Sequence, residues 1–161
     1  MSSVVGIDPS LTGTGVATAA GTLTIVTKAG DRKRLQLIHD AVFSAVEDAD
    51  LVVIEDLPTH AHGAGLTGMA QGVIRLACIR HDAPFATVPA ATLKKFATGK
   101  GNATKPDMRL ELYKRAGIDL RDDNQVDAWW LRQVGLHVTD HPDAIALPKT
   151  HTDALTKVKT P

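Results

Sequence analysis

The sequence lacks several features that would assign it to a particular class of protein. Its 161 residues include one cysteine, Cys78, which excludes an internal disulfide and argues against a thiolate metal site. Basic and acidic residues number 18 each, so the net charge gives no argument for a nucleic-acid partner. We expect neither a signal peptide nor a membrane span, because no apolar run approaches roughly 18 residues. The expectation is a cytoplasmic globular protein, for which 43% apolar residues supply the core.

Alternating patterns along the chain predict an α/β domain with a mixed sheet. Apolar runs bounded by turn residues predict buried strands at 4–8, 51–54 and 85–88, and a hairpin from 16–19 and 23–26. Amphipathic spacing predicts helices at 31–50, 65–80, 90–98, from Thr104 or Asp107 to 116, and from Asp122 or Asp123 through 134. From His137 onward, three prolines and no periodicity indicate a surface-bound or disordered tail. The predicted division is a domain at 1–136 and a tail at 137–161.

Three acids are candidates for one site. Asp8 closes the first strand and Glu55 follows the second apolar run, so both are expected at the carboxyl-end edge of the sheet. Asp127 lies on a helix whose other face is apolar, with Asn124 and Asp123 one turn before it on the same face. Carboxylate oxygens without cysteine or an adjacent histidine favour Mg²⁺ or Mn²⁺ over Zn²⁺, and such a site can hold two ions about 4 Å apart. The alternative is that the acids are unrelated caps and turn residues.

Four short motifs occur in a fixed order. They are Gly6-Ile7-Asp8-Pro9, Val52-Val53-Ile54-Glu55, residues 99–105 and Asn124-Gln125-Val126-Asp127-Ala128. From about Val4 to Gly135 their order and spacing resemble the RuvC-type Holliday-junction resolvases, a bacteriophage-type member being one option. The resemblance implies a ribonuclease H-like fold. It also implies a homodimeric, Mg²⁺-dependent endonuclease that nicks two strands of a four-way DNA junction symmetrically, in recombination or repair.

The resemblance also implies roles for single residues. Asp8 would bridge two Mg²⁺ ions, for which Mn²⁺ can substitute, and Glu55 and Asp127 would complete their shells. Lys105 resembles a catalytic basic position of the family near the scissile phosphate, and Lys94 resembles a second basic position there.

Two departures from the family pattern concern this site. The family commonly has a fourth acid three residues before the final aspartate, where this chain has Asn124. An amide oxygen can still act as a ligand, and Asp123 can substitute for the missing charge. The family often carries an aromatic residue in the loop at 56–62, whereas this loop has none. We expect its histidines, His60 and His62, to be surface residues and not a zinc pair.

A basic segment is predicted to bind DNA. Residues 94–115 carry seven lysines and arginines against two acids, a local excess of the kind that phosphate binding requires. The alternative is a solvated helix face. The residues assigned to DNA contact are Lys94, Lys95, Lys100, Lys105 and Arg109.

The helix at 65–80 is apolar on most of its sides, which indicates burial on more than one side. One face can cover the sheet, and the other then needs a partner. Resolvases of this kind dimerise through the corresponding helix, so we expect a homodimer. Its predicted interface is Met69, Gly72, Val73 and Leu76. The alternative is a core helix covered by the tail.

Two other functions are open. The first is a catalytically weak protein that binds junctions or branched DNA, which Asn124 suggests. The second is an actin-like or sugar-kinase-like phosphate-binding domain, which the turn at 8–13 suggests. That class needs two such domains, and it would leave Glu55 and Asp127 unexplained.

Overall fold

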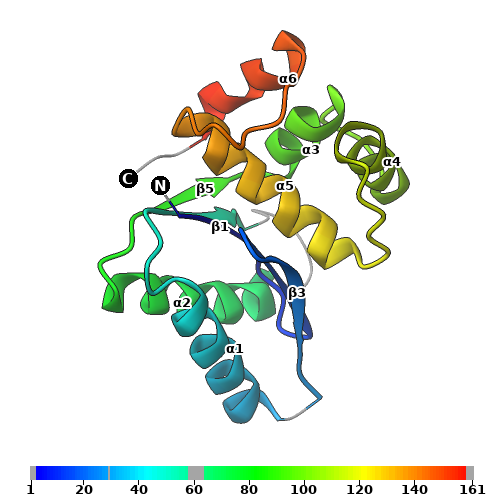
Figure 1. Cartoon of the computed structure of the whole chain (residues 1–161). Coiled ribbons are helices and arrows are strands. Elements are labelled where there is room, and N and C mark those ends of the chain that lie inside the picture. The colour runs from blue at the N-terminus through cyan, green and yellow to red at the C-terminus, as the bar shows by residue number, and fades with distance from the viewer. Residues whose placement is uncertain (1–2, 29, 58–63, 159–161) are drawn as a thin grey trace.

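The computed structural model describes residues 3–28, 30–57 and 64–158, arranged around one mixed sheet (Figure 1). The strand order is β3-β2-β1-β4-β5. The strands are β1 (Val4–Asp8), β2 (Gly13–Thr18), β3 (Gly21–Val26), β4 (Leu51–Glu55) and β5 (Phe85–Val88). β1, β4 and β5 run parallel to their neighbours in this group, whereas β2 and β3 are antiparallel additions. The predicted α/β mixed sheet is confirmed.

Helices cover both faces of the sheet. On one face, α1 (Asp31–Ala45) and α2 (Ala64–Arg80) enclose a core with the inward side chains of β1, β2 and β4. On the other lie α3 (Ala90–Thr98), α4 (Lys105–Ala116) and α5 (Asp123–Val138) (Figure 1). They enclose a second core, which includes the buried Trp130. Among the described residues, no helix combines the length and the apolar character needed to cross a membrane.

Local chemistry sets where several helices begin and end. Thr104 and not Asp107 caps α4: its hydroxyl accepts from the Asp107 amide, and the Asp107 carboxylate accepts from the Thr104 amide in return. Gly117 ends the same helix in the left-handed region, at φ 69°. Asp122, outside α5, accepts from the Asn124 amide at 2.9 Å and is its cap.

The predicted helix at 31–50 was too long, because α1 ends at Ala45. The amide of Asp50 donates to the Ser3 carbonyl at 2.8 Å, so the chain has already joined the edge of β1 there. A residue that begins the pairing of β4 with β1 cannot also continue a helix.

The segment after α5 lies against α3. His151 bonds through Nδ1 to the Phe96 carbonyl at 2.8 Å, and Ala154 is buried. Two short helical elements, α6 (Lys149–Thr152) and the 3-10 turn η1 (Asp153–Lys157), form this contact. Of the two descriptions predicted for the tail, the surface-bound one fits residues 139–158. The division at residue 136 stays a prediction, and α5 itself continues to Val138.

Two glycines let α5 lie directly on the sheet. A Cβ added at Gly6 of β1 would overlap the carbonyl oxygen of Ala128, and one added at Gly15 of β2 would overlap the carbonyl oxygen of Asn124. Neither backbone can move away without shifting the helix. The close contact therefore sets the height of α5 over β1, and with it the position of the residue before Ala128, which is Asp127.

Candidate metal centre

Three acidic side chains meet at the carboxyl-end edge of the sheet. Asp8 ends β1, Glu55 ends β4, and Asp127 lies near the start of α5. β1 and β4 are parallel neighbours, so both strand ends lie at one edge, and the contact of α5 with Gly6 brings Asp127 to the same place. One ligand atom from each carboxylate lies within 4.8 Å of the other two. Within the described part of the chain, this is the one group of three or more histidine, cysteine or acidic side chains arranged closely enough to hold a metal ion.

Burial makes the combined negative charge of this group unfavourable. Burial is the main reason why the pKa of Asp8 lies well above its usual value, and the charges of Glu55 and Asp127 raise it further. Burial also raises the pKa of Glu55 to about 7, again with a contribution from Asp127. The three carboxylates therefore need a nearby cation if they are to be ionised together at neutral pH.

Two lysines from different helices bring positive charge to the acids. The Lys105 ammonium group, at the start of α4, donates to Oδ2 of Asp127 and forms an ion pair with it. Burial alone would lower the pKa of Lys105, but the charges of Asp127, Asp8 and Glu55 raise it. The charge of Lys94, on α3, opposes the rise in pKa that burial causes at Glu55 and Asp127. Two ammonium groups against three carboxylates leave negative charge that a bound cation would balance.

The donor set fits a hard divalent cation. All three groups offer carboxylate oxygens, and no cysteine or histidine belongs to the group. Oxygen-only sets of this kind suit Mg²⁺ and Mn²⁺, whereas Zn²⁺ is usually held by nitrogen and sulfur. The residues that could hold a metal here are Asp8, Glu55 and Asp127.

The polar residues at the start of α5, Asp122 to Asn124, contact different partners. Asp123 forms an ion pair with Arg109 at 2.7 Å, so it turns toward α4 and lies outside the group of three acids. The side chain of Asn124 lies beside Gly13, and its main-chain amide donates to Asp122 at 2.9 Å. Asp122 was predicted only as a cap, yet its charge adds to the pKa rise at Asp8 that burial dominates. The signal that could have identified Asp122 is the run of acids that it opens.

The predicted DNA-contacting residues fall into two groups. Lys94 and Lys105 lie at the acids, as described, whereas Lys95 and Lys100 are exposed. Arg109 is paired with Asp123. Farther along α4, Glu111 pairs with Lys114 at 3.4 Å and with Arg115 at 2.9 Å, which neutralises part of the local basic excess.

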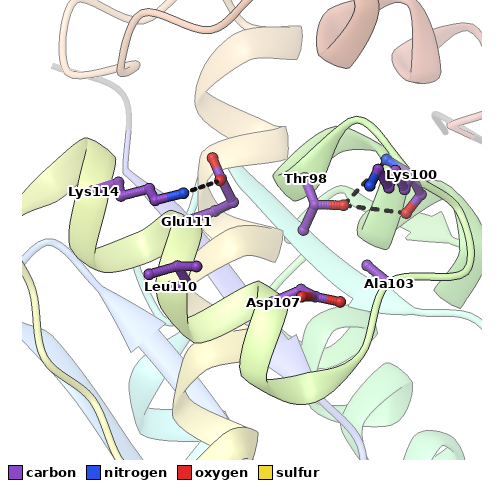
Figure 2. A pocket seen from close by; sticks show the side chains of 7 residues that line it. All are labelled: Thr98, Lys100, Ala103, Asp107, Leu110, Glu111 and Lys114. Atoms are coloured by element: carbon purple, nitrogen blue, oxygen red, sulfur yellow. Dashed lines mark hydrogen bonds and ion pairs between the residues drawn. The ribbon is translucent and has the colours of Figure 1, made fainter.

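A groove of about 180 Å³ lies between α4 and the loop after α3. Figure 2 shows its lining, in which the Glu111–Lys114 pair faces the Lys100 turn. Both charge signs line the groove, so it is not a basic channel. The lining residues are Thr98, Lys100, Ala103, Asp107, Leu110, Glu111 and Lys114.

The outer face of α2 is apolar and exposed. Met69 and Leu76 are 38% and 42% exposed, and a Cβ added at Gly72 would meet nothing within 4 Å. Leu66 and Ile79 extend this face at both ends. Val73 differs from the other predicted interface residues, because it is half-buried and packs against the core under α2. His60 and His62, with the rest of 58–63, lie outside the described residues.

Comparison with solved structures defines the class of fold. RuvC of T. thermophilus in complex with a Holliday junction substrate matches with a TM-score of 0.74 over the full length of both chains, at 19% identity. A structure of Thermus thermophilus RuvC matches with a TM-score of 0.73 over 99% of both chains, at 18% identity. The chain therefore has the ribonuclease H-like fold, as the resemblance implied.

Sequence relatives give the family. The crossover junction endodeoxyribonuclease RuvC of Rhodopirellula baltica is 35% identical over 126 residues, which cover 68% of this chain and 70% of that protein. The protein of the same name from Chlamydia trachomatis serovar L2 is 33% identical over 103 residues, 60% of this chain and 61% of that protein. The chain thus spans about 61% of the length of this Chlamydia relative. No family model matches the chain. It belongs to the RuvC family.

Proposed function

We propose that the chain is a metal-dependent endonuclease that resolves four-way DNA junctions by paired, symmetric nicks. The observation that carries the proposal is the meeting of three carboxylates from β1, β4 and α5, two of them buried and one half-buried, with the ammonium group of Lys105. The relatives are named crossover junction endodeoxyribonucleases, and a structural neighbour was solved with a junction bound, which supports branched DNA as the substrate.

The cofactor in this proposal is Mg²⁺, with Mn²⁺ as a substitute and two ions in each site. Asp8, Glu55 and Asp127 would hold the ions together, with Asp8 as the ligand that both ions share, as the resemblance implied. When bound, the ions would supply an activated water and stabilise charge on the phosphate oxygens. The low dielectric of the buried site strengthens these interactions.

The lysines act on the same phosphate. The Lys105 ammonium group already lies at the acids, where it can stabilise negative charge that develops on the phosphate in the transition state. Lys94, on α3, whose charge acts on Glu55 and Asp127, would help to orient the phosphate. Lys95 and Lys100 are exposed and would contact the DNA backbone farther from the cut. Asn124 remains a candidate fourth ligand through its amide oxygen, and the Arg109 pairing makes Asp123 the weaker candidate.

The functional unit is proposed to be a homodimer built on the outer face of α2. A four-way junction has approximate two-fold symmetry, and an isologous interface would hold two sites in a fixed relation. The exposed apolar side chains of Leu66, Met69, Leu76 and Ile79 support this placement, since a contiguous apolar face on a helix favours a partner.

Cleavage of a synthetic four-way junction tests the proposed function. With Mg²⁺, the wild-type chain should cut two strands at symmetric positions, and Asp8→Asn should abolish cutting while junction binding in Ca²⁺ persists. An amide cannot supply the bridging negative charge that two cations need. Asp119→Asn, the same change at an exposed acid, is the matched control and should cut normally. Junction binding without any cutting would favour the catalytically weak binding protein, and ATP hydrolysis without cutting would favour the kinase-like domain.

A further inference from the structure

A buried amide on α2 reaches the strand that carries Glu55. Gln71 is 2% exposed and lies on the inward face of α2, where Ile74 and Cys78 are fully buried. Its Nε2 donates to the main-chain carbonyl of Glu55 at 2.8 Å. A polar side chain in an apolar core is unfavourable unless it is hydrogen-bonded, so this one bond accounts for a glutamine at that position.

The Glu55 carbonyl needs a partner from outside the sheet. In a parallel ladder, alternate residues of β4 bond to β1. The amide of Leu51 donates to the Ser3 carbonyl, so in the same register Glu55 also faces β1, and residue 9 would donate to its carbonyl. Residue 9 is Pro9, which has no N–H group. The last carbonyl of β4 therefore lacks its ladder donor, and Gln71 takes that place.

This bond fixes the strand end that carries a proposed ligand. The next amide along, that of Asp56, donates to Val88 on the β5 side at 2.8 Å, so the strand end is held from two directions. The side chain of Glu55 must stay beside Asp8 and Asp127 although three carboxylates repel one another. A fixed main chain at Glu55 limits how far the side chain can turn away.

We propose that Gln71 is a positioning residue, which holds the end of β4 so that Glu55 stays in the metal-binding arrangement with Asp8 and Asp127. The inference rests on the proposed metal site, and it assigns to α2 a role at that site in addition to its outer face. Gln71 touches no ligand atom of the group and acts only through the Glu55 main chain.

The test compares two buried glutamines. Gln71→Met keeps the length of the side chain and removes its donor. Gln133→Met is the matched control: Gln133 is 3% exposed and accepts from the Ile145 amide at 3.1 Å, away from the acids. Binding of Mn²⁺ to the free protein is measured by electron paramagnetic resonance, with thermal unfolding recorded for each variant. Gln71→Asn is a milder second variant if Gln71→Met does not fold.

A positioning role predicts separate effects on stability and metal affinity. Both methionine variants should have a lower melting temperature than wild type. Only Gln71→Met should also weaken Mn²⁺ binding, by about tenfold, which is the lower end of the effect that outer-shell partners have on metal affinity. Equal Mn²⁺ affinities for Gln71→Met and wild type would overturn the inference. So would an equal loss of affinity in Gln133→Met, because general loosening of the core would then explain both.

Junction assays separate this inference from the proposed function. Gln71→Met should bind junctions in Ca²⁺ within about twofold of wild type, and raised Mn²⁺ should recover most of its cleavage rate. If the wild-type chain binds Mn²⁺ but leaves junctions uncut, the nuclease proposal fails while the Mn²⁺ comparison still decides the role of Gln71. A wild-type chain that binds no Mn²⁺ overturns the proposed metal site and this inference with it.

Discussion

Asp8, Glu55 and Asp127 cannot all be ionised at low cost when no cation is near. Their ligand atoms lie within 4.8 Å of one another, and burial raises the pKa of each. Lys105 offsets part of this effect through its ion pair with Asp127. The group therefore resists full ionisation in the metal-free protein, and a divalent cation bound there would balance the charge of the ionised carboxylates.

The raised pKa of Glu55 predicts how the stability of the metal-free protein changes with pH. The pKa rises from 4.5 to about 7 on folding, so between these values the folded state binds more protons than the unfolded state. The free energy of unfolding should therefore fall as the pH rises through this window. Thermal unfolding in EDTA should show the fall in wild type and a weaker one in Glu55→Gln. A steeper fall in Glu55→Gln would contradict the assignment.

Metal binding should show the opposite dependence on pH. Ionised carboxylates are the ligands, so Mn²⁺ affinity should increase as the pH rises through about 7, where Glu55 loses its proton. Calorimetric titration at a series of pH values measures this directly. An affinity that is flat between pH values of about 5 and 8 would mean that Glu55 is not a ligand.

Lys105 and Lys114 should affect different steps. Lys105→Ala should lower the single-turnover cleavage rate by roughly 10²-fold, as expected when one preorganised donor to the transition state is lost. Lys114 pairs with Glu111 and lies farther along α4, so Lys114→Ala should at most weaken binding and reduce its salt dependence. Single-turnover cleavage rates at saturating protein report the chemical step, and junction affinities at several salt concentrations report binding, so the two measurements distinguish the role of Lys105 from that of Lys114. Equal losses of binding with unchanged chemistry would make Lys105 a phosphate anchor only.

At the level of elements, contact of α5 with the sheet decides where Asp127 lies. Gly15 of β2 lies under the Asn124 carbonyl, so Gly15→Ala should destabilise the protein by roughly 1–3 kcal/mol, as overpacking typically does. Gly65→Ala is the control, since nothing lies within 4 Å of an added Cβ there. Chemical denaturation measures the free energy of unfolding of both variants. A Gly15→Ala variant as stable as wild type would show that α5 can shift without cost.

Much of this arrangement could be predicted from the order of the elements. Asp8 and Glu55 each end an apolar run, and parallel neighbours place such ends at one edge. Asp127 could be added because it lies on a helix with an apolar face. Gln71 could not be placed, because its bond depends on register: only the pairing of β1 with β4 shows that Pro9 leaves the Glu55 carbonyl without a donor.

The partners of half-buried side chains could not be predicted from the sequence either. Asp123 and Asn124 are adjacent polar residues, yet one pairs with Arg109 and the other lies beside Gly13. The choice depends on where α4 packs relative to α5, which no local pattern encodes. Val73 is a similar case, since the helical repeat places it near Met69 but its packing against the core under α2 half-buries it.

At the scale of the whole molecule, the proposed catalytic and dimer surfaces lie on different parts of the fold. α5, α4 and α3 cover one face of the sheet and bring Asp127, Lys105 and Lys94 to the acids. α2 covers the other face (Figure 1), and the exposed fractions of Met69 and Leu76 show that its apolar outer side is accessible. Substitutions on that outer side can therefore test assembly while leaving the side chains at the acids in place.

Met69→Glu should convert the proposed dimer into a folded monomer. A charge at the centre of an apolar isologous interface would be buried twice without a partner, which is strongly unfavourable. Leu110→Glu is the matched control, because Leu110 is 49% exposed on α4, away from α2. Val73 is a poorer choice, since its contacts with the core would mix folding with assembly. Light scattering gives the oligomeric state and circular dichroism the folding. Met69→Glu should also nick single strands of a junction without pairing the cuts, and a wild-type protein that is monomeric on junction DNA would rule out the dimer.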